Sequence, residues 1–372
     1  MTRPLTIVQL LPALDAGGVE RSTLEIASAL VSAGHRAVVV SAGGRMLSAL
    51  VATGAEHVEL AIGRKSPFAF RHAKTLRRLF DDVRADIVHA RSRMPAWIAL
   101  AALRGMDSPP RFVTTVHGLN SPGRYSGVML RGRRVICVSQ TVREYVLRHY
   151  PGTDPSKLAV IPRGVDPSAY ARDAQPDPLS RERLLARHPQ LAGGRLLLMP
   201  ARGTRLKGHA HALELVRNLR ADGVDARLLL AGVVQRGRER YLRELQARVA
   251  ALDLRDAVAL AEPLDGMRDL YAMADLVLQL SDKPESFGRT VIEALCSGRA
   301  VLGWDHGGVG ELLRELYPQG AVALGDAATL AQRAHSLLAA PRPSIRLPDR
   351  YTLARMQADT LALYAELVAD GR

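Results

Sequence analysis

The chain has 372 residues, of which 47% are hydrophobic and 24% are charged, a composition typical of a soluble globular protein long enough for two domains. Its net charge is +14, yet aromatic residues make up only 4% of it. Because proteins that bind single-stranded nucleic acid stack bases on aromatic side chains, this composition argues against nucleic acid as a partner. No apolar run reaches the length of about eighteen residues that a membrane-spanning helix needs.

The first elements predict a parallel sheet. A strand is expected at 4–11, a glycine-containing loop at 15–19, an amphipathic helix at 20–32 and a second strand at 37–41. The apolar start runs into glycines rather than a cleavage site, so we interpret it as a strand and not a signal peptide. The only cysteines, Cys137 and Cys296, lie far apart in apolar segments, which predicts reduced thiols and a cytoplasmic protein.

Candidate ligand contacts follow the strands of the first half. Gly17 and Gly18 stand between the first strand and helix, where backbone amides can face an anion, although a simple tight turn is the alternative. Further strands are predicted at 58–60, 87–89, 112–116 and 135–138, and helices at 69–82 and 140–150. Arg91 and His117 each come just after a predicted strand, at the edge where open α/β sheets bind ligands. A structural role for the lone histidine is the alternative.

The segment 64–80 mixes basic and aromatic residues. It fits contact with an anionic membrane surface. It fits equally well an ordinary amphipathic helix with a solvated basic face.

The second half begins after a polar, proline-bearing interval at 173–194. The elements expected there are strands at 196–200, 227–232, 257–260 and 276–280, and helices at 235–251, 267–274 and 351–369. Arg202 and Lys207 are five residues apart in a glycine-punctuated loop ahead of a helix. Two such cations can bind a diphosphate through charge-assisted hydrogen bonds, and a solvated basic loop is the alternative.

The stretch 282–311 carries the densest pattern. A polar loop with Glu285 closes at Phe287-Gly288, and a helix with Glu293 on it ends at Gly298. A buried strand is expected at 300–303, then a loop at 306–310 that contains Gly307 and Gly308, and a further helix from residue 311. Glycines stand where backbone must come close to a ligand.

Taken in order, these motifs resemble the retaining glycosyltransferases of family four, including those that build bacterial lipopolysaccharide and other envelope glycans. The resemblance rests on the glycine loop, His117, the run Ile161-Pro162-Arg163-Gly164-Val165-Asp166, the Arg202/Lys207 loop and the E-x7-E pattern from Glu285 to Glu293. Arg163 stands where the family usually has Asn, and Ala201 and Gly203 also depart from its pattern.

The resemblance implies the GT-B fold, α/β, with two Rossmann-like domains whose parallel sheets face an interdomain cleft. The expected parts are an acceptor-binding domain at 1–172, a linker at 173–194, a nucleotide-sugar-binding domain at 195–349 and a terminal helix segment at 350–372 that crosses back to the first domain.

The implied reaction moves a sugar from a nucleotide diphosphate sugar, of UDP, GDP or ADP type, to a hydroxyl of a glycan or glycolipid, with retention of configuration. Arg202 and Lys207 would neutralise the diphosphate, Glu285 and His117 would contact the donor sugar, and Glu293 would hold the ribose. The expected substrate-binding set is Gly17, Gly18, Arg91, Phe287, Gly288, Glu293, Gly307 and Gly308. The leaving phosphate takes the acceptor proton in this family, so neither a protein base nor a metal or other cofactor is expected.

The expected setting is synthesis of lipopolysaccharide core or another envelope polysaccharide, in the cytoplasm and peripherally on the inner membrane. Two alternatives remain. One is a nucleotide-sugar epimerase of GT-B architecture, and the other is a sugar-nucleotide-binding protein without catalysis.

Overall fold

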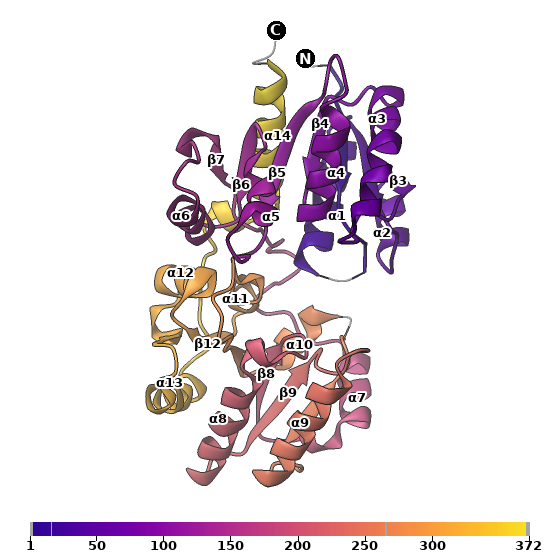
Figure 1. Cartoon of the computed structure of the whole chain (residues 1–372). Coiled ribbons are helices and arrows are strands. Elements are labelled where there is room, and N and C mark those ends of the chain that lie inside the picture. The colour runs from indigo at the N-terminus through magenta and orange to yellow at the C-terminus, as the bar shows by residue number, and fades with distance from the viewer. Residues whose placement is uncertain (1–2, 16, 265, 370–372) are drawn as a thin grey trace. The chain divides into compact units, whose positions relative to one another are not determined.

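The computed structural model describes residues 3–15, 17–264 and 266–369 (Figure 1). Residues 1–2, 16, 265 and 370–372 lie outside the described residues. The start of the expected first domain and the end of the expected terminal segment fall on them. The chain forms two compact units, 1–164 with 353–372, and 165–352.

The first unit is built on a seven-stranded parallel sheet with the order β3-β2-β1-β4-β5-β6-β7. Its interior strand β1 pairs Ile7 with Ala37 of β2 and with Ile87 of β4. Three apolar residues of β1, Ile7, Val8 and Leu10, are fully buried, as a strand covered on both faces requires. The strands are β1 (Thr6–Leu10), β2 (Arg36–Ser41), β3 (Glu56–Glu59), β4 (Ile87–Ala90), β5 (Arg111–Val116), β6 (Arg134–Cys137) and β7 (Leu158–Val160).

The strand order of this sheet reverses between β1 and β4. Right-handed crossovers therefore place α1 and α2 on one face and α3, α4 and α6 on the other. Helix α14 packs on α1 and adds Leu363, Tyr364 and Leu367 to the core that contains Ile26 and Leu30. The helices are α1 (Gly18–Ser32), α2 (Leu47–Ala52), η1 (Pro67–Arg71), α3 (His72–Asp82), α4 (Arg93–Leu103), α5 (Arg124–Gly127), η2 (Val128–Leu130), α6 (Gln140–His149), η3 (Pro155–Lys157) and α14 (Leu353–Ala369).

The second unit repeats the architecture with six parallel strands in the order β10-β9-β8-β11-β12-β13. The order reverses between β8 and β11. The strands are β8 (Arg195–Pro200), β9 (Ala226–Ala231), β10 (Val258–Ala261), β11 (Leu276–Gln279), β12 (Ala300–Trp304) and β13 (Ala321–Val322). The helices are α7 (Pro178–Arg187), η4 (Pro189–Leu191), η5 (Arg205–Lys207), α8 (His209–Ala221), α9 (Glu239–Ala251), α10 (Met267–Met273), α11 (Arg289–Cys296), α12 (Gly307–Leu316), η6 (Pro318–Gly320), α13 (Ala327–Ala339) and η7 (Asp349–Tyr351).

The predicted class of two Rossmann-like parallel sheets is confirmed, and three local expectations differ. Helix α12 begins at Gly307 rather than at residue 311, so two glycines assigned to a loop belong to its first turn. The helix expected at 69–82 is divided into η1 and α3, because Ser66 accepts a hydrogen bond from the Phe68 amide and Pro67 starts a tight turn.

The expected linker at 173–194 lies within the second unit. It contains α7, which contacts α10, and η4, which contacts β9 and β10. Packing on its own sheet thus makes this interval part of a domain, and the units divide at Gly164 and Val165 instead. Among the described residues, no helix combines the length and the apolar character that crossing a membrane demands.

Candidate functional site

Several of the predicted site residues lie where the strand order of each sheet reverses. In an open parallel sheet, the loops after the two diverging strands leave a crevice at the carboxyl ends of the strands. In the first unit these loops follow β1 and β4 and carry Gly17 and Arg91. In the second unit they follow β8 and β11 and carry Arg202, Lys207 and Glu285.

In the second unit, backbone contacts hold the β8 and β11 loops together. The Asp282 amide donates to the Leu206 carbonyl at 3.0 Å. Gly208 has φ 73°, and a Cβ there would lie 1.7 Å from the Leu280 carbonyl oxygen. Only glycine fits this left-handed, close-packed position. The glycine that ends the Lys207 turn therefore fixes the distance between the two loops.

Lys207 and Glu285 form an ion pair across these loops. The Lys207 Nζ lies 2.7 Å from Glu285 Oε1, and the Ser281 hydroxyl donates to the same oxygen. The two side chains are 24% and 23% exposed, so a ligand can reach them. Burial opposes ionisation of Glu285, but the Lys207 ammonium, the hydrogen bond from Ser281 and the charge of Arg202 together lower its pKa. Glu285 is therefore a carboxylate at neutral pH.

The other two cations of the same loop lie on the surface. Arg205 pairs with Glu244, whereas Arg202 is exposed and makes no ion pair within the part of the chain that the structure describes. Arg202 and Lys207 can thus both face an anion. The neighbouring His209 is fully buried, its Nδ1 lies 3.0 Å from the Tyr241 hydroxyl, and burial lowers its pKa to about 4.

Glu293 lies apart from the Lys207–Glu285 pair, in α11. It is 5% exposed, and its Oε2 accepts a hydrogen bond of 2.9 Å from the Tyr271 hydroxyl of α10. Burial, and then the Glu293 carboxylate, raise the pKa of Tyr271 well above its usual value, so the hydroxyl stays a donor. Sequence reasoning missed Tyr271, because a tyrosine on a short helix that also carries Arg268 and Asp269 gives no distinct signal.

The glycines after β12 pack against the Glu285 loop. The Gly308 amide donates to the Glu285 carbonyl at 2.7 Å, and a Cβ on Gly308 would lie 2.4 Å from the Phe287 Cα. Phe287 is 5% exposed and its ring packs on Tyr351, while Gly288 has φ 112° at the start of α11. These residues therefore hold the loop that presents Glu285. Their predicted contact with substrate stays a prediction.

In the first unit, Gly17 and Gly18 form the N-terminus of α1. A Cβ on Gly18 would meet nothing within 4 Å, whereas one on Gly17 would lie 2.5 Å from a carboxylate oxygen of Glu20. The Glu20 carboxylate thus occupies the space beside Gly17. An anion that binds there must displace it or approach from another side.

Arg91 is 3% exposed, so it lies beneath the surface of the first unit. Its Nε donates to Gln9 Oε1 at 2.7 Å and its Nη1 to the Ser22 hydroxyl at 3.2 Å, while its Nη2 finds no hydrogen-bond partner among the residues that the structure describes. These bonds connect the loop after β4 to β1 and α1. The predicted contact of Arg91 with substrate stays a prediction.

His117, just after β5, is held by Arg163. The Arg163 Nη2 lies 2.7 Å from His117 Nδ1, and Arg163 is 8% exposed. Because a guanidinium only donates, Nδ1 must be the acceptor, so the neutral ring carries its proton on Nε2. Burial, and then the charges of Arg163 and Arg91, lower the pKa of His117 well below its usual range. The arginine that replaces the family's usual asparagine thus orients the imidazole.

A second imidazole, that of His89 in β4, lies near His117 and links β5 to α14. It is fully buried, with Nδ1 2.6 Å from the Tyr364 hydroxyl of α14 and Nε2 2.7 Å from the Thr115 hydroxyl. Within the described ranges, no three His, Cys, Asp or Glu side chains come together as a metal site would require.

Two family models match the chain, one for each unit. Residues 16–169 match Glycosyltransferase Family 4, and residues 180–351 match Glycosyl transferases group 1. The chain is 26% identical over 184 residues to the lipopolysaccharide 1,2-N-acetylglucosaminetransferase of Salmonella typhimurium, covering 48% of this chain and 46% of that one. Across the curated relatives it matches, the chain spans 29–63% of their length.

Solved structures match over almost the whole chain. The glycosyltransferase of Rickettsia africae has a TM-score of 0.83 and 26% identity, with 100% of both chains covered. Anabaena HepE in complex with UDP has a TM-score of 0.75 and 19% identity, with 97% of this chain and 100% of that one covered. The matched models, relatives and fold agree with the motif order, and the chain belongs to the GT-B glycosyltransferases of family four type.

Proposed function

We propose that this protein transfers a sugar from a nucleotide diphosphate sugar to a hydroxyl of a glycan or glycolipid, with retention at the anomeric carbon. The observation that carries the proposal is the Lys207–Glu285 pair at the strand-order reversal of the second unit, beside the exposed Arg202. A cation that is already held 2.7 Å from a carboxylate can exchange part of that contact for a diphosphate.

The charges fit the proposed bond changes. The bond between the anomeric carbon and the diphosphate oxygen breaks with its electron pair going to the diphosphate, and the acceptor oxygen bonds to the carbon on the same face. The acceptor proton passes to the leaving phosphate. Arg202 and Lys207 would stabilise the charge that develops on the diphosphate, and Glu285 would contact the donor sugar. Glu293 would hold the ribose, and His117, as an Nε2–H donor, would bind a sugar hydroxyl.

Related proteins support the choice of substrates. HepE was solved with UDP, with UDP and glucose, and with UDP-glucose, so a UDP-sugar is the first donor to test. The Salmonella relative acts on lipopolysaccharide, and WaaG, a glycosyltransferase of lipopolysaccharide biosynthesis, shares the fold with a TM-score of 0.67. We therefore propose lipopolysaccharide core or another envelope polysaccharide as the product. We also propose a cytoplasmic enzyme that works against an anionic membrane.

A thermal-shift panel with UDP, GDP, ADP and CMP tests the donor site. One nucleoside diphosphate should raise the melting temperature, since a ligand that binds only the folded state stabilises it. Glu293→Ala should weaken that shift. Absence of any shift with the wild-type protein would contradict the proposal.

Product analysis then separates the alternatives. After incubation with the matching nucleotide sugar and an envelope-glycan acceptor, the proposal expects a glycosylated acceptor and free nucleoside diphosphate. A changed sugar nucleotide formed without acceptor would identify an epimerase. Binding without turnover of any candidate acceptor would favour a binding protein.

A further inference from the structure

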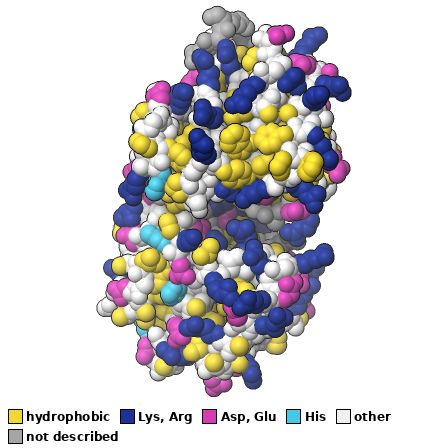
Figure 2. All heavy atoms as spheres, viewed as in Figure 1, with side chains coloured by type: hydrophobic (Ala, Val, Ile, Leu, Met, Phe, Trp, Pro, Cys, Tyr) yellow, Lys and Arg dark blue, Asp and Glu magenta, His cyan; other side chains and the backbone are white. Residues whose placement is uncertain are grey.

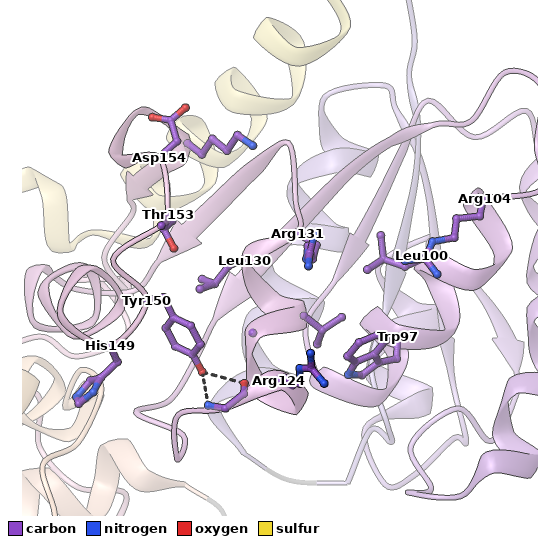
Figure 3. Close-up of a pocket in the computed structure, with 15 residues that line it drawn as sticks. Trp97, Leu100, Arg104, Arg124, Leu130, Arg131, His149, Tyr150, Thr153 and Asp154 are labelled. Atoms are coloured by element: carbon purple, nitrogen blue, oxygen red, sulfur yellow. Dashed lines mark hydrogen bonds between the residues drawn. The ribbon is translucent and has the colours of Figure 1, made fainter.

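An open groove of about 1030 Å³ lies on the α3–α4–α6 face of the first unit, between α4 and α6 (Figure 3). None of the residues assigned to sugar transfer lines it. The main lining side chains are Trp97, Leu100, Arg104, Arg124, Arg131 and Lys157.

The groove exists because the connection from β5 to β6 forms no full helix. Residues 117–133 contain only the four-residue α5 and the three-residue η2. Glycine or proline interrupts this segment at 118, 122, 123, 127 and 132, which disfavours a continuous helix. The face between α4 and α6, which a longer crossover helix would cover, therefore stays open.

The floor of the groove is apolar and ordered. Trp97 and Leu100 project from α4, and Leu130 of η2 lines the groove on the other side of Arg131, as Figure 3 shows. The Trp97 indole donates to the Tyr125 carbonyl at 3.2 Å, and the Tyr150 hydroxyl contacts the Gly123 backbone. Partly exposed aromatic rings with a satisfied polar end suit a boundary between water and apolar chains.

The rim of the groove is cationic. Arg104, Arg124, Arg131 and Lys157 are all exposed, and none of them makes an ion pair in the described part of the chain. One carboxylate, Asp154, lines the groove, and it caps η3 through a 2.9 Å bond from the Ser156 amide. Of the four, only Lys157 has a described carboxylate near it, that of Asp154, so the four cations around an apolar floor keep a net positive charge that is complementary to an anionic amphiphile.

The position of the cations separates the groove from the proposed chemistry. Arg104 ends α4 ahead of β5, Arg131 precedes β6 and Lys157 precedes β7. The amino ends of parallel strands share one edge of the sheet, so these three cations lie at the edge opposite His117. An acceptor hydroxyl at the His117 edge is therefore out of their reach.

The basic and aromatic segment 64–80 contacts α5 next to the groove. Lys65 of this segment and Arg93 of α4 each lie 5.1 Å from the centre of the Tyr125 ring of α5, the residue whose carbonyl accepts the hydrogen bond from Trp97. Phe68 and Phe70 are 80% and 42% exposed on η1. Figure 2 shows hydrophobic side chains gathered on this face of the first unit, with Lys and Arg around them.

We propose that this groove binds the phosphate headgroup and upper acyl chain of an anionic phospholipid in a bilayer. The inference names the site of the proposed membrane contact and rests on it. The cations would hold the phosphate, Trp97 and Leu100 would meet the acyl chain, and Phe68 would enter the interface beside it. Aromatic and aliphatic side chains ringed by Lys and Arg are the composition that interfacial binding favours.

Vesicle co-sedimentation of the full chain tests the site. Vesicles of phosphatidylcholine alone are compared with vesicles that contain about a third phosphatidylglycerol. Wild type should prefer the anionic vesicles, and the double variant Arg104→Ser/Arg131→Ser should partition on the order of 25-fold more weakly, since each basic residue near such a surface contributes about fivefold. Phe68→Ser should also weaken binding.

The matched control is Arg183→Ser/Arg187→Ser in α7 of the second unit, which removes the same charge and should bind as wild type does. Equal binding by the groove variant and the control would overturn the inference while leaving membrane contact intact.

No preference of the wild type for anionic vesicles would overturn both the groove as a lipid site and the proposed membrane contact. Tight binding of soluble glycerol phosphate that competes with vesicles would assign the groove to a soluble ligand, and self-association without vesicles to a second copy. The groove variant and the control should both show the wild-type thermal shift with nucleotide. This shift therefore tests donor binding independently of membrane binding.

Discussion

The carboxyl-end edges of the two sheets are built alike but are held by different forces. In the second unit, Glu285 is bonded to a cation, Lys207, and Glu293 to a hydroxyl donor. In the first unit, the cations are bonded to neutral groups, Arg91 to an amide and a hydroxyl and Arg163 to an imidazole. The edge of the second unit thus contains an ion pair. The edge of the first unit contains buried arginines whose hydrogen bonds go to neutral side chains.

This difference predicts different responses to substitution. An ion pair that is a quarter exposed can be exchanged for a charged ligand, so changes there should alter binding more than stability. A buried frame of neutral hydrogen bonds sets geometry and protonation, so changes there should alter stability and pKa values first.

The largest effect is expected from Lys207→Met. Loss of a charge-assisted hydrogen bond to the diphosphate should weaken binding of the preferred nucleoside diphosphate by about 10- to 100-fold, the equivalent of about 1.5–3 kcal/mol. Isothermal titration calorimetry measures it. Arg205→Met is the matched control. It removes the same charge from the same loop, but the Arg205 side chain is paired with Glu244 and is not expected to bind the diphosphate. An equal loss of affinity in both variants would mean that the net charge of the loop, and not a direct contact from Lys207, causes the effect.

A smaller effect is expected when alanine replaces two glycines with equivalent predicted roles. Gly308→Ala places a methyl group 2.4 Å from the Phe287 Cα and should destabilise the protein by about 1–3 kcal/mol. Gly18→Ala meets nothing within 4 Å and should be neutral or slightly stabilising. Urea unfolding followed by circular dichroism compares them. A stable Gly308→Ala protein would mean that the β12 loop does not pack on the Glu285 loop.

The smallest effect is expected from Arg163→Asn, which restores the family's usual residue. The pKa of His117 lies well below its usual range because of burial first and then Arg163. Below pH about 6.5, the unfolded chain therefore binds more protons than the folded one, and stability falls as the pH decreases through this range. Removing Arg163 should raise the pKa of His117 and reduce that loss.

An NMR titration of the His117 ring in wild type and Arg163→Asn measures this directly, and the nitrogen shifts report whether Nε2 carries the proton. Arg104→Asn, at the opposite edge of the sheet, should leave both unchanged. An unaltered His117 titration in Arg163→Asn would mean that Arg163 neither lowers the pKa of His117 nor orients its ring.

Local sequence patterns determined the fold class and the places of the site. Strand runs between helices specify parallel sheets, and the motif residues stand at strand ends because ligand-binding loops follow strands there. Ser139 stands directly before the helix expected at 140–150, where serine favours capping, and its hydroxyl accepts a hydrogen bond from the Val142 amide. Each of these features depends on residues close together in the chain, which a sequence pattern records.

The partners of the site residues were decided by tertiary structure. Lys207 meets Glu285 across 78 residues, and Arg163 meets His117 across 46. Neither pairing has a local signature, because each depends on which strands lie side by side. The same holds for Gly308, whose pattern predicted a loop that touches ligand but whose position is a helix turn packed on another loop. Periodicity shows which residues are buried or at a strand end, whereas only the order of strands in the sheet decides what each of them touches.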